Sequence, residues 1–143
     1  MNPTDTIPNP ASPAPALDPS LVSYTHVIYA LHALSAFIGF VGAAGIVTHF
    51  IFGLPSIVAV IMNYARRSAV RGTLLESHFR WQIRTFWFAL LAWVVVSAVS
   101  IPLMLVLVGF ATLVLGMIAI AIWLIYRIAR GWIALNDRRP MYV

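Results

Sequence analysis

Two long apolar stretches, residues 24–64 and 85–126, dominate the hydrophobic pattern of the chain, and neither contains an acidic residue, a lysine or an arginine. As one straight helix, each stretch would be about 60 Å long at about 1.5 Å per residue. The hydrocarbon core of a bilayer is only about 30 Å thick, and tilting a helix does not absorb a twofold excess. Each stretch is therefore predicted to fold back on itself as a helical hairpin.

The second stretch predicts two membrane spans, at residues 86–107 and 112–129, with a turn near Gly109. Pro102 indicates either a kink in the first of these spans or an earlier turn. The sequence leaves both interpretations open.

The first stretch fits one helix at residues 24–45 and a second at 46–64, which contains Gly53 and Pro55. If both helices cross the membrane, the protein has four spans, and its N-terminal tail lies on the same side as the arginines that follow residue 64. If Gly53-Leu54-Pro55 breaks the second helix into a re-entrant or interfacial piece, there are three spans and the tail lies on the other side. Four spans are preferred, and three stay open.

Residues 74–86, between the stretches, have the periodicity of an amphipathic helix. Its apolar face is Leu75, Phe79, Ile83 and Phe86, and its polar stripe is Glu76, Arg80 and Arg84. Trp81 and Trp87 suit the aromatic belt at a membrane surface. This pattern predicts an interfacial helix on the inner leaflet, with arginines that reach lipid headgroups.

Together these elements predict an all-α, polytopic membrane protein with four transmembrane helices and one interfacial amphipathic helix. Residues 1–22 form a proline-rich tail that is predicted to be disordered. Residues 23–136 form the helical transmembrane domain, and residues 137–143 form a short C-terminal tail. The N-terminal tail has no lysine, arginine or apolar core, so it is not predicted to be a secretory signal.

Composition and charge agree with a bilayer as the solvent. Hydrophobic residues make up 62% of the chain and charged residues 9%, against about 25% charged residues in an ordinary soluble domain. All nine basic side chains are arginines that flank the apolar stretches, as topology signals do. The arginines predicted to set topology or contact headgroups are Arg66, Arg67, Arg71, Arg80, Arg84, Arg127 and Arg130, followed by Arg138 and Arg139. Both groups are expected to be cytoplasmic, which requires an even number of spans between them. The expected partners are the lipid bilayer, an anionic lipid and another membrane protein, not nucleic acid.

One polar cluster is a candidate site. His78 and Gln82 are spaced i, i+4 and project into the apolar arc of the amphipathic helix, where an unpartnered polar group costs about 1–3 kcal/mol. The favoured interpretation is that they tie this helix to a neighbour, through Asn63 or a helix end. The alternative is a small polar site at the cytoplasmic mouth of the bundle, formed by Asn63, Glu76, His78 and Gln82.

Other candidate chemistry is sparse. The chain has no cysteine, which excludes disulfides and thiolate catalysis, and it has neither a nucleophile elbow nor a Gly-rich phosphate loop. No catalytic residue, metal site or cofactor is predicted. His26, His32 and His49 are interpreted as interhelical hydrogen-bonding groups rather than metal ligands or proton carriers.

Small residues at four-residue spacing predict two helix-packing seams, because they let helix backbones approach closely. The seams are Ser35, Gly39 and Ala43 in the first stretch, and Thr112 and Gly116 in the last span. Contact within the monomer is favoured over contact between copies, and the oligomeric state stays open.

Three segments resemble a bacterial family of small inner-membrane proteins whose function is not established. They are GLPSIVAVIMNYARR, RGTLLESHFRWQIRTFW and IYRIARGWIALNDRRPM, and the similarity covers residues 24–141. That family is distantly similar to the membrane subunit of the chloroplast inner-envelope import translocon. The resemblance implies a four-helix fold in a bacterial inner membrane, and it implies no activity, substrate or catalytic residue.

These observations favour a non-enzymatic accessory or scaffold component that acts through a membrane partner or an anionic lipid. The main alternative is a small-solute or ion transporter, or part of a pore. An enzyme centred on Glu76 and His78 is the least favoured function.

Overall fold

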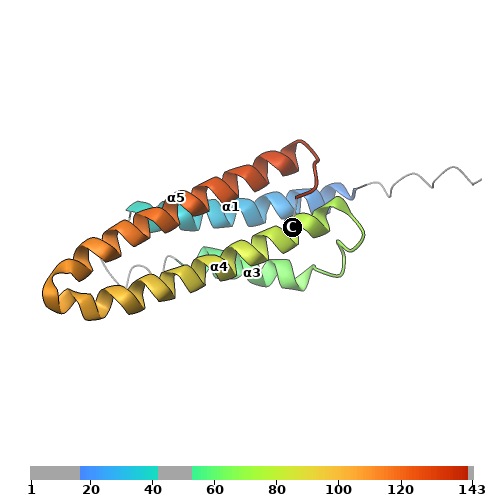
Figure 1. Cartoon of the computed structure of the whole chain (residues 1–143). Helices are drawn as coiled ribbons and strands as arrows, with labels where there is room; N and C mark the ends of the chain where they lie inside the picture. Colours follow the sequence, from blue (N-terminus) through green and yellow to red (C-terminus); the bar gives the residue numbers. More distant parts are fainter. Residues whose placement is uncertain (1–16, 42–52, 142–143) are drawn as a thin grey trace, which may run out of the picture.

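The computed structural model describes residues 17–41 and 53–141, and all regular structure in these two ranges is helical. The helices are α1 (Pro19–Val41), α3 (Leu54–Ala65), α4 (Leu74–Leu103) and α5 (Val108–Asn136), with a 3₁₀ turn at Met104–Val106 between the last two. Figure 1 shows them side by side in an elongated bundle. The predicted all-α fold is confirmed.

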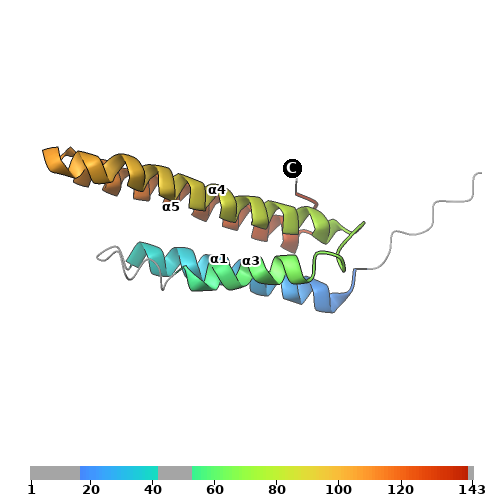
Figure 2. The same cartoon turned by 90° about the horizontal axis from the view of Figure 1, so that it is seen from below.

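The helices form two antiparallel pairs that lie as two layers, α1 with α3 and α4 with α5 (Figure 2). The start of α1, the end of α3, the start of α4 and the end of α5 therefore lie together at one end of the bundle (Figure 1). This end carries the loop 66–73 and the segment 127–139, and with them both groups of arginines. We call it the arginine end.

Three of the described helices, α1, α4 and α5, are long and apolar enough to cross a membrane. Helix α3 is apolar but has 12 residues, which is only about 18 Å of helix. Residues 42–52 lie outside the described residues, and with them the predicted boundary at residue 45, Ala43 and His49. The described part of the chain thus holds three full-length candidate spans and a shorter helix that returns the chain to the arginine end.

The α4–α5 pair requires hydrocarbon around it. In the most apolar 18-residue window of each of these helices, only 6% of the residues are buried. Leu105, at the tip of the hairpin, is 91% exposed. So much exposed apolar surface is unfavourable in water and favourable in lipid.

The start of α4 is fixed by a local capping arrangement. Thr73 is the N-cap, and its hydroxyl accepts a hydrogen bond from the Leu75 amide at 3.2 Å. Glu76 reaches back to accept from the amide of Gly72 at 2.9 Å, and Gly72 has φ +72°, a conformation that glycine adopts readily. A Thr-x-x-Glu sequence is a known signal for a helix start.

The predicted interfacial helix differs from the structure in one respect. Residues 74–86 are helical, but they form the first turns of α4 and continue without a break to Leu103. No glycine or proline stands between the amphipathic part and the apolar part, so the backbone has no reason to turn there.

The turn between α4 and α5 lies at residues 104–107, slightly before the predicted position near Gly109. Pro102 is in the last turn of α4, and Leu107 closes the turn in the left-handed region at φ 62°. Gly109 lies against the backbone of Ser100 and Met104, where a Cβ would overlap it. Glycine at 109 is thus needed for close packing rather than for the turn itself.

The buried core lies at the arginine end. It consists of Ile28, Tyr29, Ala59, Val70, Leu75, Phe79, Ile128 and Leu135, which come from all four helices and the loop before α4. Helix α1 begins at Pro19, before the predicted domain boundary at residue 23, with Asp18 accepting from the Ser20 amide at 2.8 Å. Hydrogen bonds from Ser20 hold the pKa of the Asp18 carboxyl below its ordinary value.

Candidate functional site

His78 is the centre of the polar cluster at the arginine end, and it connects three parts of the chain. It is fully buried. Its Nδ1 is 3.0 Å from the hydroxyl of Tyr29 on α1, and its Nε2 is 2.9 Å from the backbone carbonyl of Arg139, beyond α5. A carbonyl oxygen only accepts hydrogen bonds, so Nε2 carries the proton. In the neutral ring Nδ1 then accepts from the Tyr29 hydroxyl.

The segment after α5 folds back onto α4 to meet this histidine. Arg138 adopts a left-handed conformation at φ 52°, and the amide of Arg139 donates to the carbonyl of Ala134 at 2.8 Å. The amide of Met141 donates to the Ser77 hydroxyl at 2.9 Å, and its side chain is buried. Residues 137–141, which the sequence analysis assigned to a C-terminal tail, are therefore packed against the helical domain.

Of the four residues of the predicted polar cluster, Asn63, His78 and Gln82 are buried and Glu76 is partly exposed. Glu76 caps α4 and forms an ion pair of 3.3 Å with Arg80, with a side chain that is 38% exposed. Glu76 is exposed because it belongs to the polar stripe of α4, which points away from the buried face that begins with Leu75. His78 is engaged in the tie described above, as the favoured sequence interpretation states.

Asn63 on α3 and Gln82 on α4 are buried, and none of their side-chain amide atoms has a hydrogen-bond partner in the structure. Gln82 lies close to the Tyr29 hydroxyl, outside hydrogen-bonding geometry. The Nε2 of His32 on α1 is also unpartnered, whereas its Nδ1 is 3.2 Å from the Ser56 hydroxyl. Buried polar atoms of this kind normally find a partner, so within residues 17–41 and 53–141 these three side chains carry the buried polar atoms without one.

A second constellation lies on the seam between α4 and α5. The guanidinium carbon of Arg127 is 3.6 Å from the ring centre of Trp81 and 5.1 Å from that of Trp123. The Nε of Arg127 donates to the Thr85 hydroxyl at 2.8 Å, and the Trp81 ring nitrogen donates to the Arg127 carbonyl at 3.2 Å. Arg127 is thus held in one orientation by hydrogen bonding and by cation–π contact.

Two further arginines lie near this one. The guanidinium carbon of Arg130 is 5.9 Å from the same Trp81 ring, and both Arg84 and Arg130 act electrostatically on Arg127. The sequence reasoning named all three as headgroup or topology residues. It missed their convergence, because a stack between Trp81 and Arg127 requires the register of α4 against α5.

The depth of this constellation follows from helix lengths. From Thr85 to Leu103 on α4, and from Val108 to Tyr126 on α5, the chain has roughly 19 residues, or about 28 Å of helix. This matches a hydrocarbon core of about 30 Å. A hairpin that spans a core of this thickness from its tip places Arg84 and Arg127 where the hydrocarbon ends and the headgroups begin.

The other predicted arginines lie in and around the loop before α4. Arg66 contacts the Tyr24 ring, with its guanidinium carbon 5.6 Å from the ring centre. Arg67 and Arg71 are exposed, and Arg80 pairs with Glu76.

The two predicted packing seams have different outcomes. Thr112 donates to the Ser100 hydroxyl at 3.1 Å, and Gly116 lies against Val96, so this seam joins α5 to α4 within one chain. Gly39 has no described atom within 4 Å of its Cβ position, and Ala43 is outside the described residues. Ser35 is half-buried. The sequence reasoning missed Gly131, where α5 packs so closely on the Tyr29 ring of α1 that a Cβ would overlap the ring.

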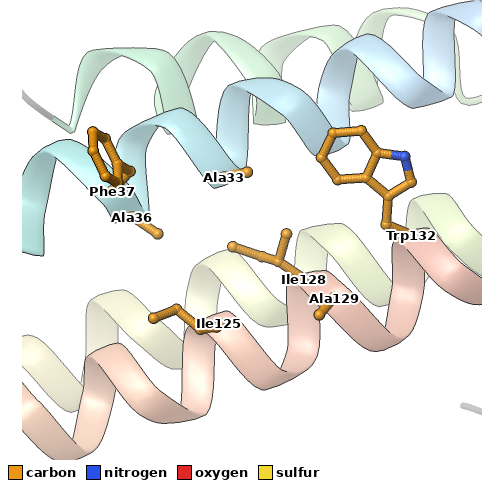
Figure 3. A pocket seen from close by; sticks show the side chains of 7 residues that line it. All are labelled: Ala33, Ala36, Phe37, Ile125, Ile128, Ala129 and Trp132. Carbon is orange, nitrogen blue, oxygen red and sulfur yellow. The ribbon is translucent and has the colours of Figure 1, made fainter.

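An apolar groove of about 310 Å³ lies between α1 and α5 (Figure 3). Ala33, Ala36 and Phe37 line it from α1, and Ile125, Ile128, Ala129 and Trp132 line it from α5. His26 lies near this groove, with its ring centre 6.4 Å from that of Trp132.

Comparison with protein-family models, with curated proteins and with solved structures finds no match to this chain. The class of the protein therefore follows from the fold. Three long apolar helices, with almost no buried residues in the most apolar windows of α4 and α5, make it a multi-pass helical membrane protein.

Proposed function

We propose that this chain is a non-enzymatic accessory or scaffold component of a bacterial inner membrane, with its arginine end on the cytoplasmic side. The proposal is supported chiefly by one observation. Both groups of arginines, separated in sequence by the α4–α5 hairpin, lie at the same end of the bundle (Figure 1). Arginine on one side of a set of spans is the usual mark of the cytoplasmic face. The bacterial location follows from the family resemblance alone.

The polar groups at the arginine end are arranged as structural bonds, which supports a scaffold role rather than a catalytic one. Glu76 and His78 were the pair on which a catalytic interpretation depended. Glu76 is occupied in capping α4 and pairing with Arg80, and His78 is occupied in joining α1 to the C-terminal segment. The arginine end is thus a packed platform, and the apolar helices extend from it into the lipid.

Co-purification tests the accessory role. Tagged full-length protein, cross-linked in cells and purified in mild detergent, is expected to carry one other membrane protein in near-constant proportion, identified by mass spectrometry. An unrelated small membrane protein of the same host, tagged in the same way, is the control. Recovery of the chain with lipid alone, or with the same set of proteins as the control, would exclude a stable partner.

Transport is the second candidate function, and the unpartnered polar atoms of His32, Asn63 and Gln82 favour it. Such groups inside a bundle are the kind that a polar solute or a proton path uses. The measurement is solute or ion flux into liposomes that contain the purified protein. Flux that His32→Ala abolishes, with the melting temperature unchanged, would favour transport over the accessory role.

A further inference from the structure

The α4–α5 seam at the arginine end carries positive charge that no described carboxylate balances. Each described acid has another partner. Asp18 accepts a hydrogen bond from the Ser20 amide at the start of α1. Glu76 pairs with Arg80, and Asp137 pairs with Arg139 at 3.1 Å. Within residues 17–41 and 53–141, none of these acids pairs with Arg84, Arg127 or Arg130. Arg127 is held by packing, and Arg84 and Arg130 are exposed neighbours that act on it electrostatically. Three guanidinium groups near one another without a counter-charge produce a positive potential suited to an anion.

Arg127 is the most preorganised of the three. Its Nε is used by Thr85 and its plane is stacked over Trp81, while its two terminal nitrogens have no partner among the described residues. A planar guanidinium with both terminal nitrogens available matches the spacing of two phosphate oxygens. Two exposed neighbours are additional donors. One is Arg130, whose terminal nitrogen donates to the Tyr126 hydroxyl at 2.9 Å, and the other is Arg84.

The position of this site selects the source of the phosphate. The three arginines lie about one hydrocarbon thickness from the hairpin tip, at the level of the lipid headgroups. Trp81 and Trp123 are half-buried beside them, as tryptophans are at this level. Exposed apolar side chains continue from the site along both helices, including Phe88 and Ile122. A lipid can use these surfaces for its acyl chains, and a free phosphate ion cannot.

We propose that Arg84, Arg127 and Arg130 bind the headgroup of a phospholipid that carries two phosphates, such as a diphosphatidylglycerol. One phosphodiester supplies a single negative charge and satisfies Arg127. With one phosphate, two of the three arginine charges would stay uncompensated. A second phosphate in the same headgroup binds Arg84 and Arg130 and leaves only one positive charge in excess. The proposal rests on the proposed function only in taking the protein as resident in a bilayer.

Native mass spectrometry of the full-length protein in mild detergent tests the site. We expect one bound diphosphatidylglycerol, held about tenfold more tightly than phosphatidylglycerol. Its second phosphate gains charge-assisted bonds to the exposed Arg84 and Arg130, and the two bonds together contribute about a factor of ten. The double variant R84Q/R130Q is expected to lower this affinity about tenfold. The matched control R67Q/R71Q removes two exposed arginines from the same end and is expected to lower it about threefold or less.

Further variants separate binding from folding. R127K keeps the charge but loses the stacked fork, so it is expected to weaken binding when measured below its melting temperature in phosphatidylcholine nanodiscs. If R84Q/R130Q melts early in those nanodiscs, the single variants R84Q and R130Q take its place, and each is expected to lose part of the affinity.

Three results would overturn the proposal. They are equal losses in R84Q/R130Q and R67Q/R71Q, equal affinity for phosphatidylglycerol, and displacement of the lipid by millimolar inorganic pyrophosphate, which would identify a site for soluble phosphates. Failure of the accessory role would appear in the co-purification instead. Lipid binding by the isolated protein does not depend on a partner or on which side of the membrane the arginine end faces.

Discussion

A single buried imidazole determines how the C-terminal segment meets the rest of the bundle. His78 presents one ring nitrogen to α1 and the other to the backbone beyond α5. Both bonds join parts of the chain that are far apart in sequence, so they stabilise the folded bundle and have no counterpart in an isolated α4. His78 and Tyr29 are both buried, so the bond between them is expensive to lose. The bond to the Arg139 carbonyl is partly buried.

Replacing this histidine tests whether it is structural. His78→Leu removes two hydrogen bonds and leaves the Tyr29 hydroxyl and the Arg139 carbonyl without partners. It is expected to lower the free energy of unfolding by about 1–3 kcal/mol, seen as a lower melting temperature in mild detergent and lower abundance in cells. Unchanged folding together with a lost cellular phenotype would instead assign His78 to a functional site.

Gln82, one turn further along the same face, is the matched comparison. Its amide atoms have no hydrogen-bond partner in the structure, so Gln82→Met, of similar shape, gives up no bond and relieves a buried polar group. The melting temperature is expected to stay the same or rise. A loss as large as that of His78→Leu would show that the Gln82 amide has a partner in the membrane.

At this scale the sequence predicted the burial of His78 and Gln82, because their i, i+4 spacing placed both on the apolar arc. It did not predict the partners of His78. The tyrosine lies on another helix, and the carbonyl is reached only because Arg138 reverses the chain in a conformation that glycine usually supplies. Glu76 takes part in a Thr-x-x-Glu cap at 73–76, a signal that the sequence contains and that the polar-cluster interpretation did not use.

Among the helices, the contact between α1 and α5 depends most on a single glycine. Gly131 faces the Tyr29 ring, which is itself fixed by its bond to His78 and has little room to shift. Position 131 therefore has no room for a side chain, unlike the positions of the exposed apolar residues of α5.

Gly131→Ala is expected to destabilise the bundle by about 1–3 kcal/mol, the usual cost of overpacking a fitted contact. Gly39→Ala on α1 is the control, because no described atom lies within 4 Å of its Cβ position. That change is expected to be neutral or to stabilise by up to about 1 kcal/mol through helix propensity. Melting temperatures of the two variants in the same detergent decide the matter, and equal effects would contradict the assigned contact.

The sequence predicted the helices better than their ends. The absence of charge over residues 85–126 was sufficient to predict a hairpin, since one helix of that length exceeds a bilayer. The exact turn depended on Leu107 adopting a left-handed conformation without a glycine, which no composition signal marks. The amphipathic segment was correctly predicted as helix. This segment continues into the rest of α4 because no glycine or proline interrupts it. The pattern of polar and apolar faces within residues 74–86 gives no information about that continuation.

The whole molecule has two parts with different solvents. At the arginine end, side chains from all four helices form a buried core like that of a small soluble domain. Beyond the level of Arg127, the α4–α5 hairpin is exposed on nearly every side and ends in an apolar tip. The packed end holds the buried core, the His78 bonds and the Gly131 contact, while the hairpin is joined by its own close contacts at Gly109 and Gly116.

The antiparallel arrangement makes a definite prediction about sidedness. The chain has no native cysteine, so single cysteines can report the location of Ser12, Ser68 and Asn136. Asn136 is exposed, whereas Met141 beside it in the fold is buried and would label poorly. All three sites are expected to react with a membrane-impermeant maleimide only after the cells are permeabilised, because α1 with α3, and α4 with α5, each return the chain to the same end.

Reaction of Ser68→Cys and Asn136→Cys from opposite sides would contradict the α4–α5 hairpin. Reaction of Ser12→Cys from the side opposite to Ser68→Cys would contradict the pairing of α1 with α3, and would leave three crossings instead of an even number.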